Sequence, residues 1–209
     1  MLKPYRNEEG IEIGVDEAGR GPLFGRVYTA AVILPKDNFD HHRIKDSKLI
    51  KSKKKIKELS EYIKKNSIWA ITYCDEKEID EMNILQATLH SMKQSIQNIL
   101  THDPTTILID GPYFHPIVRF NQVIQRMEQI PHECIVNGDN TYTCIAAASI
   151  LAKVARDEYI EELCKENPEL HEKYGLLTNK GYGTKKHMDG IKKYGITEYH
   201  RKSFAPCKI

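Results

Sequence analysis

Several features that would assign a protein class are missing from this 209-residue sequence. No run of apolar residues is long enough to span a membrane or to form the core of a signal peptide, so we expect a cytoplasmic protein without membrane contact. The five cysteines are widely separated and form no C-x-x-C pair, which argues against structural zinc and redox chemistry. Low-complexity tracts and internal repeats are also missing. We therefore expect one compact globular domain over residues 1–209.

The net charge is small, at +2, but the charges are unevenly distributed along the chain. Residues 43–57 contain eight Lys or Arg and one acid, and residues 173–209 contain nine and two. The rest of the chain is therefore acidic. Two basic segments on an acidic body suit a phosphate backbone that approaches a carboxylate-lined metal site. For residues 51–57 alone, a solvated lysine-rich helix is the alternative interpretation.

Hydrophobic periodicity predicts five strands interleaved with helices. We expect the strands at residues 11–15, 27–34, 67–74, 105–110 and 133–136. We expect helices at residues 52–66, 82–100, 117–130 and 143–167, with Asp139 or Thr141 as the cap of the last, and short helices and loops from about residue 169. This order predicts an α/β fold, a mixed five-stranded sheet flanked by helices with a helical C-terminal extension over about 169–209.

Four acidic residues fall at or just past the ends of predicted strands. Asp16 and Glu17 end the first strand, Asp110 ends the fourth, and Asp139 follows the fifth. Sites in open α/β sheets are commonly built at strand ends, and acids gathered there repel one another unless a cation neutralises them. Oxygen ligands without His or Cys suit Mg²⁺ or Mn²⁺, and two such ions could support hydrolysis of a phosphodiester.

Asp16 and Glu17 present a geometric difficulty, because neighbouring residues in a regular strand point to opposite faces. We expect the chain to leave strand geometry here, which Gly19 and Gly21 permit, or Glu17 to contribute its backbone carbonyl. Asp139 taken alone would be interpreted as a turn residue or helix cap. If Asp139 caps the predicted helix, Asp157 lies roughly 27 Å from it along the helix axis, which is too far for the two to share a metal. We therefore expect Asp157 to pair with Arg156 or Lys153.

The motifs GVDEAGRGPLFG, DSKLI, LIDG, NGD, IAAASILAKVARD, NKGYGT and YHRKSF occur in this order over nearly the whole chain. Together they resemble ribonuclease HII. The resemblance implies a ribonuclease H-like sheet in which Asp16, Glu17, Asp110 and Asp139 bind two Mg²⁺ or Mn²⁺ ions and are catalytic. It implies an endoribonuclease that hydrolyses the RNA strand of RNA/DNA hybrids and cuts 5′ to single ribonucleotides in duplex DNA, leaving 3′-hydroxyl and 5′-phosphate ends.

The resemblance also assigns substrate-binding residues. The Gly19-Arg20-Gly21 loop would recognise the ribose 2′-hydroxyl with closely approaching backbone groups, and Arg20 would hold a flanking phosphate. Tyr182 would sense the RNA-to-DNA junction by stacking on the next deoxyribose. A lysine near the scissile region and further phosphate contacts complete the expected set: Lys48, Lys180, Arg201 and Lys202.

The expected partners are RNA/DNA hybrids and DNA that contains ribonucleotides. We expect a monomer, and the terminal SFAPCKI carries no aromatic sliding-clamp motif. The chain departs from the family pattern at Arg26, at Pro112-Tyr113 and at Asn137. Two other interpretations stay open: another nuclease of the ribonuclease H-like superfamily, which would share the acids but not the ribose-sensing loop, and a hybrid-binding module without catalysis.

Overall fold

The structure is a computed structural model that describes residues 2–45, 50, 52–122 and 124–208. Its centre is a five-stranded mixed sheet in the order β3-β2-β1-β4-β7, which confirms the predicted fold class. The strands β1 and β2 and the strands β2 and β3 pair antiparallel, whereas β1–β4 and β4–β7 are parallel. The strand bounds are β1 (Glu12–Ala18), β2 (Val27–Ile33), β3 (Ile68–Cys74), β4 (Thr106–Asp110) and β7 (His132–Ile135).

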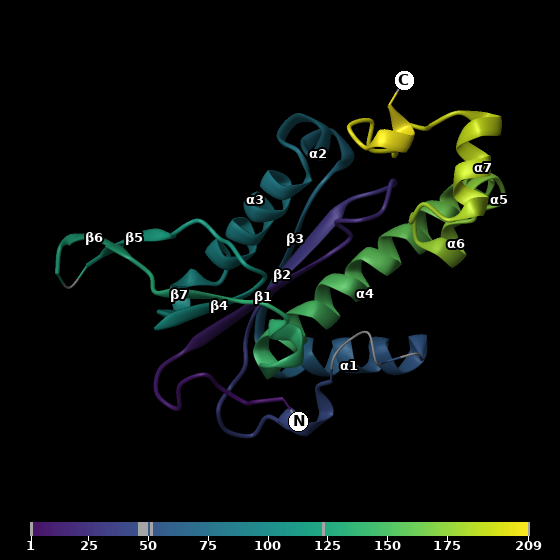
Figure 1. Cartoon of the computed structure of the whole chain (residues 1–209). Coiled ribbons are helices and arrows are strands. Elements are labelled where there is room, and N and C mark those ends of the chain that lie inside the picture. The colour runs from purple at the N-terminus through teal and green to yellow at the C-terminus, as the bar shows by residue number, and fades with distance from the viewer. Residues whose placement is uncertain (1, 46–49, 51, 123, 209) are drawn as a thin grey trace.

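Helices cover both faces of this sheet (Figure 1). Helices α1 (Lys53–Asn66) and α4 (Thr143–Glu166) pack on one face, where Ala30, Val32 and Leu108 meet the apolar side of α4. Helix α3 (Ile84–Gln97) packs on the other face against Ile13 and Val15. Alternation along each strand thus supplies two separate apolar clusters.

Helix α4 crosses the sheet closely at Gly14 of β1. A Cβ placed on Gly14 would lie 2.2 Å from the backbone carbon of Cys144, inside the first turn of α4. Only a residue without a side chain allows this crossing. The contact fixes the start of α4 beside β1, so the helix runs alongside the strand that carries Asp16 and Glu17.

Residues 117–130 were predicted to be helical, and this prediction is wrong. They form a hairpin of β5 (Val118–Asn121) and β6 (Arg126–Gln129), which projects from the main sheet in Figure 1. Arg119 Nε donates to Glu128 Oε1 at 2.7 Å across the two strands, and Phe120 pairs with Met127. The alternation of large apolar and charged residues over this short stretch favours strands, and these cross-strand pairs stabilise them.

Two predicted helix boundaries also need correction. The N-cap of α4 is Tyr142, without a side-chain hydrogen bond, and Asp139 lies in the preceding 3-10 turn η4 (Gly138–Asn140). The predicted helix at 82–100 is preceded by a separate helix, α2 (Glu76–Met82). Asn83 divides α2 from α3 because its φ of +70° cannot continue a helix, and its side chain caps α3.

The C-terminal segment forms short helices, as predicted. They are α5 (Pro168–Tyr174), α6 (Leu176–Asn179) and α7 (Lys185–Tyr194), followed by the 3-10 turn η5 (Ala205–Cys207). Backbone hydrogen bonds from Leu23 N to Gly181 O and from Arg201 N to Leu23 O join this segment to the loop after β1. None of the helices described is both long and apolar enough to cross a membrane.

Candidate active site

A cavity of about 440 Å³ opens where β1 ends and its following loop begins. It is bounded by residues from β1, β4, α4 and the C-terminal segment, which are distant in sequence. The described residues that line it are Asp16, Glu17, Ala18, Gly19, Arg20, Gly21, Ile50, Asp110, Ser149, Lys153 and Tyr182. Most of the residues predicted for the site therefore meet in one place.

Asp16 is the most deeply buried carboxylate of this cavity, with 4% of its surface exposed. Burial raises the pKa of Asp16 well above its usual value, and the negative charges of Glu17 and Asp110 raise it further. Ser149 of α4 and the backbone N–H of Glu17 both donate to Asp16, the latter at 2.7 Å to Oδ1, and favour the ionised form. Burial also raises the pKa of Glu17, opposed by Arg20, whose Nη1 lies 3.6 Å from Glu17 Oε1.

The prediction that the chain leaves strand geometry at Asp16 and Glu17 is wrong. Both residues lie within β1, paired with Ala30 and Thr29 of β2, and the strand continues to Ala18. Both residues nevertheless line one cavity, which lies at the end of β1. The longer side chain of Glu17 reaches it there and meets Arg20.

Asp110, the last residue of β4, is the third carboxylate of the cavity. Its Oδ1 accepts a hydrogen bond of 2.6 Å from the backbone N–H of Gly138. Asp139 follows in the same turn and is 1% exposed, but it is not among the described residues that line the cavity. The structure thus gathers three of the four predicted ligands and places the fourth in the turn that contacts Asp110.

The three carboxylates leave the cavity with clustered negative charge. This arrangement suits a divalent cation with oxygen ligands, because such an ion would offset both the burial and the mutual repulsion. No set of three acidic, His or Cys side chains in the described part of the chain already forms an arrangement that could hold a metal. Metal binding by these residues therefore stays a prediction.

Two buried arginines that are distant in sequence hold residues 19–25, the segment that begins with the Gly19-Arg20-Gly21 loop. Arg156 of α4 donates to the carbonyls of Phe24 and Lys180, at 3.2 and 2.9 Å. Arg201 donates through Nε, Nη1 and Nη2 to four carbonyls of the loop, at 2.6 to 3.0 Å. Those carbonyls belong to Gly19, Arg20, Pro22 and Gly25. The loop is thus held with its backbone in one conformation.

Arg201 was predicted to contact substrate phosphate, and the structure places its guanidinium on backbone carbonyls of residues 19–25. Its side chain is 0% exposed and four hydrogen bonds engage its guanidinium. Burial, with the nearby charge of Arg156, lowers the pKa of Arg201 to about 9. The sequence could not distinguish an arginine that binds a phosphate from one that binds backbone carbonyls, because a guanidinium serves both.

The other predicted substrate residues have different environments. Tyr182 is 51% exposed, and a Cβ placed on Gly21 would lie 3.3 Å from its ring, so the tyrosine and the loop share one surface. Lys180 is paired with Glu161, Nζ to Oε1, at 2.9 Å. Lys48 lies outside the described residues. Asp157 pairs with Lys153 at 3.5 Å, which confirms the structural pairing predicted for it.

Three residues of the site were missed by sequence reasoning: Ser149, Lys153 as a cavity residue, and Arg156 as a support of the loop. Ser149 sits in an alanine-rich helix, where a small polar residue gives no signal of its own. Its only signal in the sequence is its position within the family motif IAAASILAKVARD. Arg156 was expected only as one of two alternative partners of Asp157, the other being Lys153, and nothing local in the sequence indicates that it reaches carbonyls of two other segments.

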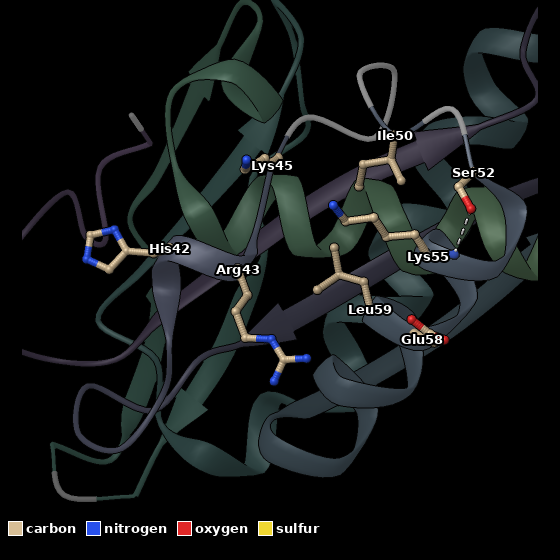
Figure 2. A pocket seen from close by; sticks show the side chains of 8 residues that line it. All are labelled: His42, Arg43, Lys45, Ile50, Ser52, Lys55, Glu58 and Leu59. Atoms are coloured by element: carbon tan, nitrogen blue, oxygen red, sulfur yellow. Dashed lines mark hydrogen bonds between the residues drawn. The ribbon is translucent and has the colours of Figure 1, made fainter.

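A second cavity, of about 730 Å³, lies between the 3-10 turn η1 (His41–Arg43) and the start of α1 (Figure 2). Half of the described residues that line this basic cavity are His, Arg or Lys, and the full set is His42, Arg43, Lys45, Ile50, Ser52, Lys55, Glu58 and Leu59. Figure 2 shows Lys55 extending between Ile50 and Leu59. Ile50 lines both this basic cavity and the carboxylate cavity, so the two are neighbours.

Comparison with known proteins identifies the family of the chain. The family model for ribonuclease HII matches residues 13–207. Ribonuclease HII of Pelagibacter ubique is 47% identical over 196 residues, which cover 94% of this chain and 96% of that protein. Ribonuclease HII of Parabacteroides distasonis is 45% identical over 98% of this chain and 94% of its own length.

Solved structures show the same fold. The crystal structure of ribonuclease H2 from Pyrococcus horikoshii matches with a TM-score of 0.72 at 24% identity, over 94% of this chain and 95% of that one. A ribonuclease HIII crystallised in complex with Mn²⁺ matches with a TM-score of 0.69 at 22% identity, over 95% of this chain and 68% of that one. The family-model match and the two relatives establish that this chain belongs to the ribonuclease HII family.

Proposed function

We propose that the cavity bounded by Asp16, Glu17 and Asp110 is the catalytic site at which the chain hydrolyses RNA joined to or embedded in DNA. As a member of the ribonuclease HII family, the chain is an endoribonuclease of the ribonuclease H type. The observation that carries the proposal is the meeting of three carboxylates, from β1 and β4, with a glycine loop that is fixed by buried arginines. The bond cut would be the one 5′ to a ribonucleotide.

The carboxylates would bind divalent cations, with Asp139 joining from the turn next to Asp110. Mg²⁺ or Mn²⁺, when bound, supplies activation of a water and stabilisation of the leaving oxygen. The Mn²⁺ complex of the related ribonuclease HIII supports this choice of ion. Ser149 would orient Asp16 through its hydrogen bond, and the Gly138 N–H would hold the Asp110 carboxylate in place.

Selection of a ribonucleotide would come from the Gly19-Arg20-Gly21 loop. A 2′-hydroxyl both donates and accepts a hydrogen bond. A backbone carbonyl can accept from it, and a backbone N–H can donate to it. Arg201 binds the carbonyls of Gly19 and Arg20, and Arg156 binds the carbonyl of Phe24 just after the loop, so the loop would need little rearrangement when substrate arrives. Arg20 is half-exposed beside Glu17, where it could contact a flanking phosphate.

Tyr182 would test the nucleotide that follows the ribonucleotide. Its ring lies beside Gly21 and is about half exposed, so one face is available for stacking on a deoxyribose. Residues 169–209, which carry Tyr182, would then act as the substrate-binding extension. Because Tyr182 and the loop share one surface, the ribose and the sugar after it would be read side by side.

The basic cavity of Figure 2 would bind the phosphate backbone of the substrate where it extends beyond the catalytic cavity. Ile50 lies between the two, and Arg43, Lys45 and Lys55 provide the positive charge. Contacts of this kind contribute affinity without sequence preference, and they weaken steeply as salt rises. A charge-neutral variant such as Lys55→Gln should raise KM at moderate salt and leave kcat unchanged.

A cleavage assay tests the proposed function. The protein is incubated with a hybrid of one RNA and one DNA strand, and separately with an all-DNA duplex of matched sequence. Each reaction is run once with Mg²⁺ and once with EDTA in its place. We expect cuts in the RNA strand alone, and only with Mg²⁺. Cutting of the all-DNA duplex would favour a different nuclease of the superfamily. Tight hybrid binding without any cutting would favour the non-catalytic binding module.

A further inference from the structure

Two buried histidines lie in direct contact behind Tyr182, and catalysis as proposed above uses neither. His187 belongs to α7 and His200 to the segment that follows it, and both are 0% exposed. Their Nε2 atoms lie 3.1 Å apart. An imidazole pair with no access to solvent needs every ring nitrogen to have a matching partner, because unmatched buried polar atoms are costly.

The outer ring nitrogens decide where the protons are. His187 Nδ1 lies 3.0 Å from the carbonyl oxygen of Tyr182, which can only accept, so this nitrogen carries a proton. His200 Nδ1 lies 2.9 Å from the backbone N–H of Thr197, which can only donate, so this nitrogen is bare. If both rings are neutral, His200 carries its proton on Nε2 and His187 Nε2 has none. His200 Nε2–H can then donate to His187 Nε2.

The result is a directed chain of hydrogen bonds from Thr197 through His200 and His187 to the backbone of Tyr182. An additional proton on either ring would place two donors opposite each other, at Thr197 or between the rings. Burial lowers the pKa of His187, and burial with the neighbouring His187 lowers the pKa of His200 to about 4. Both rings are therefore neutral at pH 7, as the chain requires.

The rings around the pair connect it to the Gly19-Arg20-Gly21 loop. Phe24, three residues after Gly21, packs edge-on against His200 at 5.0 Å and forms a backbone bridge with it. Tyr174 of α5 packs against both rings of the pair, and its hydroxyl donates to Gly195 O. The buried guanidinium of Arg201, next to His200 in sequence, is already committed to loop carbonyls.

We propose that His187 and His200 are positioning residues that hold the backbone of Tyr182 so that its ring stays beside Gly21. This inference rests on the proposed role of Tyr182 as the junction sensor. The remaining backbone bonds of Tyr182, from its N–H to Asn179 O and from Thr184 N–H to its carbonyl, are local to its own turn. The histidine pair ties that carbonyl to the segment that also carries Arg201, so the tyrosine and the ribose-sensing loop share one support.

A spectroscopic test does not depend on activity. Nitrogen-15 NMR of the unmodified protein with labelled histidine distinguishes the two neutral tautomers from each other and from the charged ring. We expect His187 as the Nδ1–H form, His200 as the Nε2–H form, and a coupling between the two Nε2 atoms. A charged ring at pH 7, or His187 as the Nε2–H form, would overturn the proposal.

A kinetic test separates positioning from general structural support. His187→Leu removes the donor to Tyr182 O, whereas His187→Asn places an amide N–H near the position of Nδ1. The readout is kcat/KM on DNA with one ribonucleotide divided by kcat/KM on an all-RNA/DNA hybrid. We expect this ratio to fall about tenfold in His187→Leu, the effect of one lost hydrogen bond, and to recover partly in His187→Asn. His115→Asn, an exposed histidine far along the chain, is the control.

The outcomes distinguish the inference from the function on which it rests. An equal fall on both substrates in His187→Leu would mean that the pair supports the fold only, and would overturn the positioning role. Tyr182→Ala is measured in parallel. If it lowers the ratio while His187→Leu leaves it unchanged, the positioning role fails and the sensor role stands. If Tyr182→Ala leaves the ratio unchanged, both fail.

Discussion

Gly19 lies directly on the buried guanidinium of Arg156: a Cβ at Gly19 would be 2.2 Å from Arg156 Nε. The glycine also has a φ of +98°, which residues with side chains rarely adopt. Two separate features therefore favour glycine at position 19: the positive φ of its backbone and the close contact with the Arg156 side chain of α4. This contact explains in physical terms why a rigid loop at the end of β1 begins with glycine.

Gly19→Ala should destabilise the protein through both effects. Overpacking against Arg156 and backbone strain together predict a loss of ~2–4 kcal/mol in the free energy of unfolding. Gly195→Ala is the matched control, because Gly195 also has a positive φ, +79°, but its Cβ would meet open space. Urea denaturation of the two variants separates strain from clash. Equal losses in both would show that Arg156 does not confine Gly19.

Arg201→Met should lower stability more than it weakens substrate binding. Four carbonyls of residues 19–25 would lose this donor, and buried groups left without partners cost about 1–3 kcal/mol each, so we expect a loss of at least ~4 kcal/mol. Arg201→Lys should not restore it, because an ammonium cannot reach carbonyls spread around a planar guanidinium. Lys192→Met, at an exposed lysine of α7 for which no substrate contact is predicted, serves as control. A raised KM with an unchanged melting temperature would instead revive the predicted phosphate contact.

Asp110→Asn should abolish cleavage without unfolding the protein. The amide oxygen can still accept from Gly138 N–H, but one of three clustered charges is removed. We expect kcat to fall by at least about 100-fold, the scale of losing one strong electrostatic contact in an active site. Without metal, the variant should melt at a higher temperature than the parent, because repulsion with Asp16 is relieved. Cleavage at the parent rate would remove Asp110 from the mechanism.

Stability should fall on acidification partly because of the His187–His200 pair. The unfolded chain binds protons at histidine near pH 6.5, whereas burial lowers the folded pKa of His200 to about 4 and lowers that of His187. The unfolded state thus binds more protons as the pH falls from about 7 towards 4, and the folded state loses stability. Urea midpoints of the parent and of His200→Asn, compared at several pH values, isolate the contribution. The difference between the two should shrink towards pH 4.5.

The fold was largely predictable because its strands carry strong local signals. Val27 to Ile33 is a buried β-branched run, and Gly-Pro punctuation marks the end of β4 after Asp110. The hairpin at residues 117–130 was missed because its two strands have only four residues each, so a period of two was hard to separate from a helical pattern. The cross-strand pairs between β5 and β6 stabilise the hairpin.

The sequence predicted those site residues whose type alone indicates their chemistry. It did not predict the residues whose role depends on burial and on contacts with distant segments. Acids at strand ends indicated Asp16, Glu17 and Asp110 as neighbours. Nothing in the sequence indicates that Arg201 is buried beneath the loop, or that His187 meets His200, because these contacts join segments that the sequence leaves unrelated. The side chains that support the site are therefore visible only once the C-terminal segment is placed.

The most direct measurement places one ribonucleotide in an otherwise all-DNA duplex and maps the cut with and without Mg²⁺. The account predicts a single cut on the 5′ side of the ribonucleotide, with 3′-hydroxyl and 5′-phosphate ends, that disappears in EDTA and in Asp110→Asn. Cleavage that persists in EDTA, or that falls elsewhere in the duplex, would contradict the claim that these carboxylates and the glycine loop form a metal-dependent site for ribose.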